Sequence, residues 1–128
     1  MYYIYILRCE DGKLYTGITT DVQRRFAEHS EQGGKGARFT RSHKPEAVEA
    51  VWSAADRSLA SKLEYRIKSL TRAQKLALIA ENSHFAEYFG EEADKLYKRE
   101  KLRIENFLRQ HRTELVLKMR RQIFRQIV

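Results

Sequence analysis

The stretch YYIYILRCEDGKLYTGIT, residues 2–19, decides the fold of the N-terminal half of this 128-residue chain. Tyr, Ile, Leu and Thr at its two ends favour strands, and the polar Glu10-Asp11-Gly12 between them favours a turn. We therefore predict a β-hairpin with strands at residues 2–9 and 14–19. A two-residue loop would place Tyr5 and Tyr15 on opposite faces of this hairpin. A three-residue loop, with Gly12 in the left-handed region and a bulge, would place both phenols on one face, so the turn must be bulged if they act together.

Capping-box patterns mark two of the helices that we expect after the hairpin. Thr20-Asp21-Val22-Gln23 opens a helix to about residue 31, and Thr71-Arg72-Ala73-Gln74 opens another to about residue 81. Between them we predict a third strand at residues 48–54 and a helix after Asp56. On the first helix, Arg25 and His29 fall beside the apolar stripe, at the rim where helix and sheet meet. The pattern predicts an α+β fold with a small three-stranded antiparallel sheet flanked by helices.

The charge of the chain suits a polyanionic partner such as nucleic acid. There are 25 Lys and Arg against 17 Asp and Glu, a net charge of +8, although such a charge can also serve solubility alone. We expect the glycine-rich stretch at residues 32–45 to form a basic loop over the same rim. Its cations, which should grip phosphates, are Lys35, Arg38, Arg41 and Lys44.

Two classes of protein are disfavoured by what the chain lacks. Cys9 is the only cysteine, which excludes an intramolecular disulfide and a cysteine-based zinc site. No apolar run reaches membrane length and no signal segment is visible, so we expect a cytoplasmic protein.

Residues 83–128 differ in composition and read as almost wholly helical. They lack proline, and Gly90, their only glycine, precedes Glu91 at a helix start. We predict a domain at residues 1–82 and a basic amphipathic helical extension at residues 83–128. Its apolar stripe comprises Ile104, Leu108, His111, Leu115, Met119, Ile123 and Ile127. An unbroken helix from Glu91 to the end would be roughly 55 Å long. It either folds back on the domain or meets a second chain in a homodimer, and a tail that only adds stability is a further alternative.

The order of the N-terminal motifs resembles that of the GIY-YIG nucleases, over about residues 1–81. The nearest group is the small stand-alone bacterial proteins related to the nuclease domain of a branched-DNA resolving enzyme. The matching elements are Tyr3-Ile4-Tyr5, Tyr15-Thr16-Gly17, Arg24-Arg25, His29, Glu64 and the segment Gly36-Ala37-Arg38-Phe39-Thr40-Arg41. Tyr3 and Thr16 depart from the family motifs, but neither change removes a reactive group. Asn82 is the nearest candidate for an asparagine that several members carry.

The resemblance implies an endonuclease that cuts DNA with one divalent ion, Mg²⁺ or Mn²⁺, in repair or recombination. Tyr5 and Tyr15 would then position or activate the attacking water, with His29 assisting Tyr5. Arg25 would contact the phosphate, Arg24 would help to bind nucleic acid, and Glu64 would hold the metal.

These residue types suit the reaction. Charge that gathers on the phosphate oxygens is stabilised by a guanidinium and a metal ion. A tyrosine with an unperturbed pKa near 10 is a poor base at pH 7. We expect nearby Arg25 and the metal charge to lower the tyrosine pKa, and His29 could accept the proton.

Two alternatives stay open at this point. Glu64 lies four residues before Lys68, so by itself it is typical of a surface ion pair. The chain as a whole could be a nucleic-acid-binding module that kept the fold without useful catalysis. Such a module would bind DNA in a salt-sensitive way and would not cut it.

Overall fold

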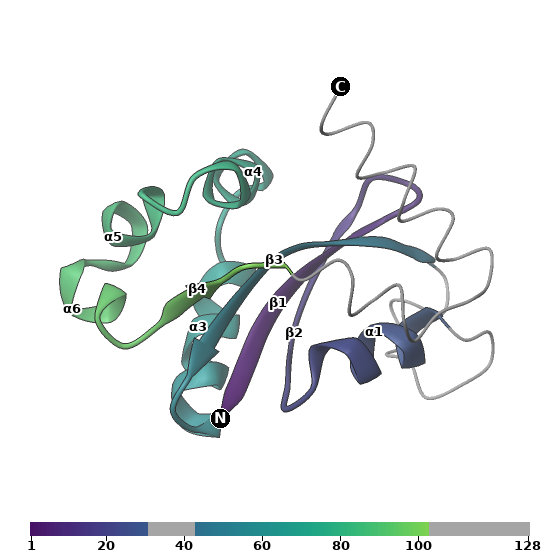
Figure 1. Cartoon of the computed structure of the whole chain (residues 1–128). Coiled ribbons are helices and arrows are strands. Elements are labelled where there is room, and N and C mark those ends of the chain that lie inside the picture. The colour runs from purple at the N-terminus through teal and green to yellow at the C-terminus, as the bar shows by residue number, and fades with distance from the viewer. Residues whose placement is uncertain (31–42, 103–128) are drawn as a thin grey trace.

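A four-stranded antiparallel sheet with helices on both faces forms the fold (Figure 1), as the computed structural model of residues 1–30 and 43–102 shows. The strands lie in the order β2-β1-β3-β4. They are β1 (Tyr2–Cys9), β2 (Leu14–Thr19), β3 (Pro45–Ala54) and β4 (Lys98–Glu100). The helices are α1 (Val22–Ser30), α3 (Arg57–Lys68), α4 (Arg72–Ala80), α5 (His84–Phe89) and α6 (Glu91–Asp94). The predicted α+β class is confirmed, with one more strand than expected.

The turn between β1 and β2 is the bulged one. The Gly12 N–H donates to the Cys9 carbonyl at 2.9 Å, and the Cys9 N–H donates to the Lys13 carbonyl at 2.8 Å. Gly12 has a φ of 83°, the left-handed conformation that glycine adopts without steric cost. The register pairs Tyr5 with Gly17 and Leu7 with Tyr15. Both tyrosines therefore point to the same face of the sheet.

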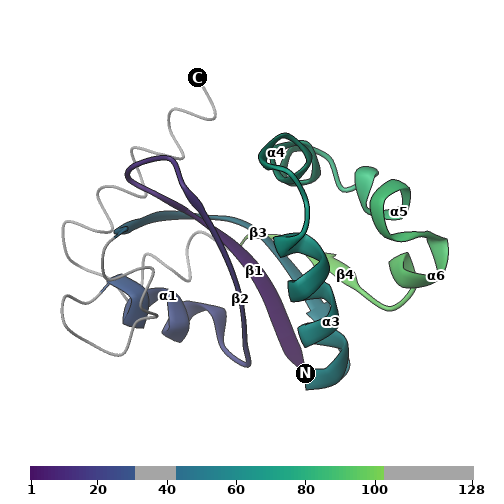
Figure 2. The same cartoon turned by 180° about the vertical axis from the view of Figure 1, so that it is seen from behind.

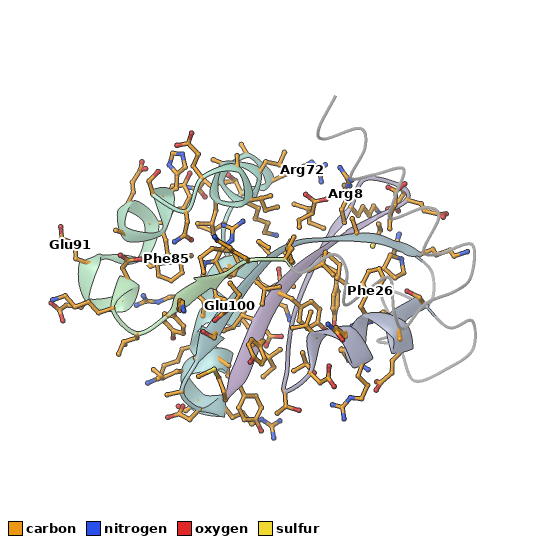
Figure 3. All side chains as sticks on the ribbon, in the orientation of Figure 1. Arg8, Phe26, Arg72, Phe85, Glu91 and Glu100 are labelled. Atoms are coloured by element: carbon orange, nitrogen blue, oxygen red, sulfur yellow. The ribbon has the colours of Figure 1, made fainter. Side chains whose placement is uncertain are left out.

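The alternation of side chains along β1 and β3 divides the core into two clusters, one on each face of the sheet. Figures 1 and 2 show α1 on one side of the strands and α3 to α6 on the other. The larger cluster, on the α3 side, contains Ile4, Ile6, Ala50, Trp52, Ala54, Ala60, Leu63, Ile67, Leu78 and Phe85. The smaller cluster, under α1, contains Tyr5, Leu7, Phe26, Val48 and Val51. In Figure 3, Phe26 lies between α1 and the sheet.

Two of the predicted helix starts are confirmed and one shifts by a residue. Asp56 caps α3 by accepting from the Leu59 N–H at 2.9 Å, and Thr71 with Gln74 forms the predicted capping box of α4. At α1, the expected capping box at Thr20 is wrong. Asp21 makes this cap instead, because its carboxylate accepts from the Arg24 N–H, three residues further on, at 3.1 Å.

The prediction of an almost wholly helical segment after residue 83 is wrong in its described part. The helix expected at Glu91 is α6, which has only four residues, and the chain then enters β4 antiparallel to β3. The Tyr97 hydroxyl donates to the Leu59 carbonyl at 2.6 Å, and its ring lies 5.8 Å from that of Phe85. Burial against the sheet and α3 therefore overrides the helical preference. The apolar stripe from Ile104 to Ile127 lies outside the described residues.

Within residues 1–30 and 43–102, no helix combines the length and the apolar character that a membrane crossing requires.

Candidate active site

A buried tyrosine–histidine pair lies at the centre of the face under α1. The Tyr5 hydroxyl is 2.8 Å from Nε2 of His29, and each residue is only 2% exposed. Tyr5 comes from the central strand β1, and His29 from the last turn of α1. The Tyr15 ring lies 6.3 Å from that of Tyr5 and 5.1 Å from the imidazole, measured between centroids. Two phenols and an imidazole therefore meet at one place, as the hairpin register requires.

Gly17 makes room for this cluster. A Cβ atom on Gly17 would lie 2.5 Å from the Tyr5 hydroxyl oxygen and 3.2 Å from Cε1 of Tyr15. A Cβ contact of 2.5 Å is essentially never seen in proteins, and the Tyr5 ring that it would meet is buried. The motif glycine is therefore needed for close approach and not for an unusual backbone angle. The sequence marked Gly17 as part of a motif, but only the cross-strand register identifies this role.

Burial sets the protonation states of the cluster. It lowers the pKa of His29 to about 4, with help from the Arg25 charge and against the Glu28 charge, so the imidazole is neutral at pH 7. Burial also raises the pKa of Tyr5 and that of Tyr15 above the ordinary tyrosine value, although Arg25 acts to lower both. The protonated Tyr5 hydroxyl can thus donate to Nε2 of His29, in the tautomer that carries its proton on Nδ1.

The expectation that nearby Arg25 would leave the tyrosines with a lowered pKa is therefore wrong for the protein alone. The guanidinium acts in the expected direction on Tyr5 and Tyr15, but loss of hydration outweighs it.

Arg25 lies at the edge of the cluster and Arg24 lies outside it. The Arg25 side chain is 25% exposed, whereas that of Arg24 is 60% exposed. Nη1 of Arg25 donates to Oε2 of Glu28 at 2.7 Å, and Nε of Arg24 is 3.5 Å from Oε1 of the same carboxylate. Burial acts to lower the pKa of Arg25, but its bond to Glu28 and the proximity of Tyr5 raise it. No motif pointed to Glu28, which in the sequence resembles an ordinary surface acid on a helix.

Glu64 lies on α3, which packs against β1 and β2, and it is near enough to the cluster for its charge to act on the two tyrosines. Its charge acts to raise the pKa of both Tyr5 and Tyr15. It also pairs with Lys68 at 3.5 Å, as the spacing of four residues favours. The described residues contain no group of three or more His, Cys, Asp or Glu that could hold a metal ion by themselves. A single carboxylate beside phenols still fits one Mg²⁺ or Mn²⁺ ion that keeps several waters and takes phosphate oxygens.

Asn82 does not join the tyrosine cluster. Its Oδ1 accepts from Nε1 of Trp52 at 2.8 Å, and Trp52 belongs to the larger core on the other face of the sheet. This amide therefore satisfies a buried indole, which is a structural role.

Of the four cations predicted to bind phosphates in the basic loop, only Lys44 lies within the described residues. It is exposed, and its carbonyl accepts from the Glu10 N–H at 2.9 Å. Nδ1 of His43 lies 2.5 Å from Oδ2 of Asp11. These two contacts fix the end of the segment to the β1–β2 turn. Lys35, Arg38 and Arg41 lie outside the described residues.

Comparisons with known proteins agree with this fold. The model of the GIY-YIG catalytic domain matches residues 1–77, and the chain belongs to this family. The domain is a nuclease domain, so membership implies nuclease-type activity on nucleic acid.

Named relatives are small proteins of the same kind. The UPF0213 protein YhbQ of Escherichia coli O8 (strain IAI1) is 49% identical over 86 residues, which cover 67% of this chain and 84% of that protein. YhbQ of Escherichia fergusonii matches with the same identity and coverage. The solution structure of the UPF0213 protein BH0048 from Bacillus halodurans has 43% identity and a TM-score of 0.40. That match covers 62% of this chain and 84% of that one.

Proposed function

We propose that the protein is a metal-dependent endonuclease that hydrolyses phosphodiester bonds in DNA. The observation that carries this proposal is the buried bond between the Tyr5 hydroxyl and a neutral His29, with Tyr15 and the Arg25 charge beside it. A core needs no such group of titratable side chains, whereas hydrolysis needs an acceptor for a proton and a cation for the phosphate.

The residues divide the reaction between them. Tyr5 takes a proton from the attacking water while it passes its own proton to Nε2 of His29, so no phenolate has to accumulate. The raised pKa of Tyr5 makes a free phenolate costly, so the two proton transfers have to be concerted, with the neutral imidazole as the final acceptor. Tyr15 positions the water, and the Arg25 fork holds the non-bridging oxygens as charge gathers on them. A divalent ion held by Glu64 would supply further stabilisation of that charge.

Cleavage assays on labelled DNA test the proposal. We expect single-stranded, duplex or flapped DNA to be cut with Mg²⁺ or Mn²⁺ and not with EDTA. Arg25→Ala and Glu64→Ala should abolish cutting in a protein that remains folded. Tyr5→Phe should lower the rate by roughly 10²–10⁴-fold, because it removes the proton relay.

Tyr65→Phe is the matched control for Tyr5→Phe, because Tyr65 is 74% exposed on α3. It should cut as the parent does. If Arg25→Ala and Glu64→Ala both cut as fast as the parent, the proposed site is wrong.

A nucleic-acid-binding module without useful catalysis is the second candidate. The raised pKa of Tyr5 and the pairing of Glu64 with Lys68 favour it, since both oppose chemistry in the free protein. Salt-dependent DNA binding with no metal-dependent product would select this candidate.

A further inference from the structure

One carboxylate joins the two arginines of α1. Within Val22–Ser30, Glu28 is the only acidic residue, and its two oxygens are divided between two guanidinium groups. Oε2 accepts from Nη1 of Arg25 at 2.7 Å, and Oε1 lies 3.5 Å from Nε of Arg24. The exposed pair with Arg24 adds a weak restraint on the second oxygen, and the shorter, more sheltered bond to Arg25 is the one that holds the carboxylate. Its orientation toward Arg25 is therefore restricted.

The three side chains differ in how far they are exposed to solvent. Arg25 and Glu28 are 25% and 22% exposed, whereas Arg24 is 60% exposed. The bond between Glu28 and Arg25 is thus the more sheltered of the two, and shelter from water strengthens a charge-assisted hydrogen bond. Arg25 in turn lies close enough to Tyr5, Tyr15 and His29 for its charge to act on all three.

We propose that Glu28 is a positioning residue for Arg25, which holds the guanidinium in the orientation that meets the scissile phosphate. An arginine side chain loses conformational entropy when it is fixed. A guanidinium that is already held in place loses less of this entropy when the phosphate binds. A guanidinium has five N–H donors, and the bond to Glu28 engages only one nitrogen of Arg25. Glu28 alone therefore does not occupy all of the donors that could meet a phosphate. The inference rests on the proposed nuclease function and adds a residue to its site.

A competing role for Glu28 is to occupy the phosphate position until the substrate displaces it. The two roles predict opposite changes. Removing a placeholder would tighten DNA binding and keep or raise kcat. Removing a positioning residue lowers kcat while binding is kept.

The experiment compares Glu28→Ala and Glu28→Gln in the full chain with labelled DNA and Mg²⁺. We expect Glu28→Ala to lower kcat on the order of 10- to 100-fold with KM unchanged or lower. Glu28→Gln should recover much of the loss, because its amide oxygen can still accept from Arg25. An unchanged or raised kcat in Glu28→Ala overturns the proposal.

The control is Glu92→Ala, which removes an acid with the same spacing of three residues from its partner. Glu92 on α6 pairs with Lys95 at 3.2 Å. Its removal should change kcat less than about twofold, because a change in net charge alone acts on binding and its salt dependence. An equal loss of kcat in both variants overturns the proposal.

A second readout does not depend on cutting. The Nε–H resonance of Arg25 in ¹⁵N-labelled protein should lose order and exchange faster with water in Glu28→Ala, and should not change in Glu92→Ala. If the parent never cuts DNA but Arg25 loses order in Glu28→Ala, the nuclease function is overturned while the positioning of Arg25 is still supported. Unchanged order in Glu28→Ala would overturn the positioning itself.

Discussion

At Gly17 the absence of a Cβ atom lets the Tyr5 hydroxyl lie against β2 and reach His29. The motif could be found in the sequence, whereas the shared face of Tyr5 and Tyr15 depended on the turn being the bulged one, which the structure confirms. The direction of the tyrosine pKa shift could not be predicted from the sequence, since it depends on how much water the packed rings exclude. Glu28 was also missed. Its bond to Arg25 depends on rotamers that spacing does not fix.

The buried His29 should make the stability of the protein depend on pH. Its pKa is about 4 in the folded chain, against about 6.5 for an unperturbed histidine, so the unfolded chain binds this proton more tightly. The contribution to stability is therefore fully present above about pH 6.5. It is lost as the pH falls towards 4, by about 3 kcal/mol in all.

Urea unfolding of the parent and of His29→Gln across this range measures the effect. The glutamine cannot titrate, and its amide can still bond to the Tyr5 hydroxyl. We expect the stability of the parent to fall more steeply from pH 6.5 to pH 4 than that of the variant. Equal slopes for the two chains would show that His29 is not buried in its neutral form.

At the scale of elements, the strands and helices with a regular apolar pattern were predictable, and β4 was not. Its three residues, Lys98–Glu100, carry no apolar alternation, so nothing in them indicates a strand. The strand forms because its neighbours anchor it. Ser53 on β3 donates to the Glu100 carboxylate at 2.7 Å, and Tyr97 is bonded to the start of α3. Such contacts join residues far apart in the chain, which local propensity does not describe.

Arg99 on β4 should stabilise the end of α4. Its Nη1 and Nη2 donate to the carbonyls of Leu78 and Ile79 at 3.1 and 3.0 Å, and its guanidinium lies 5.0 Å from the Trp52 ring centre. Burial lowers the pKa of Arg99, but the group keeps its charge at neutral pH. We expect Arg99→Met to lower the free energy of unfolding by about 1–3 kcal/mol, because the two carbonyls lose a charged partner.

Lys98→Met is the control for this change, since Lys98 is exposed on the same strand. Urea unfolding of both variants should show a loss only in Arg99→Met. A similar loss in Lys98→Met would mean that strand pairing, and not the cap of α4, is affected.

At the scale of the whole molecule, several properties stay predictions. A homodimer through the C-terminal stripe depends on residues outside the described part of the chain, as does phosphate binding by Lys35, Arg38 and Arg41. The cytoplasmic location and a role in DNA repair rest on sequence interpretation. The division of the chain at residue 82 is also a prediction, and the packing of α5 offers a direct way to test it.

Phe85 lies beyond that division and is fully buried in the larger core, with its ring 6.1 Å from that of Trp52. In Figure 3 it is located on α5, the helix that follows the proposed boundary. A chain that ends at residue 82 loses this ring, together with Tyr97 and the cap that Arg99 provides. We expect it to be less stable than a chain of residues 1–102 by at least the roughly 3–5 kcal/mol that removing one buried Phe costs.

Urea unfolding of the two shortened chains and of the full chain measures the difference. The chain of residues 1–102 keeps every contact named above, so it should unfold close to the full chain if the last residues do not stabilise this core. A chain of residues 1–82 that matches the other two would establish an independent domain at the predicted boundary. It would also show that the core of the shorter chain can repack without the ring of Phe85. The expected loss of stability in the chain of residues 1–82 would instead show that residues 84–100 belong to the same folding unit. Removing α5 uncovers one face of the sheet and exposes Trp52 to water, which costs free energy.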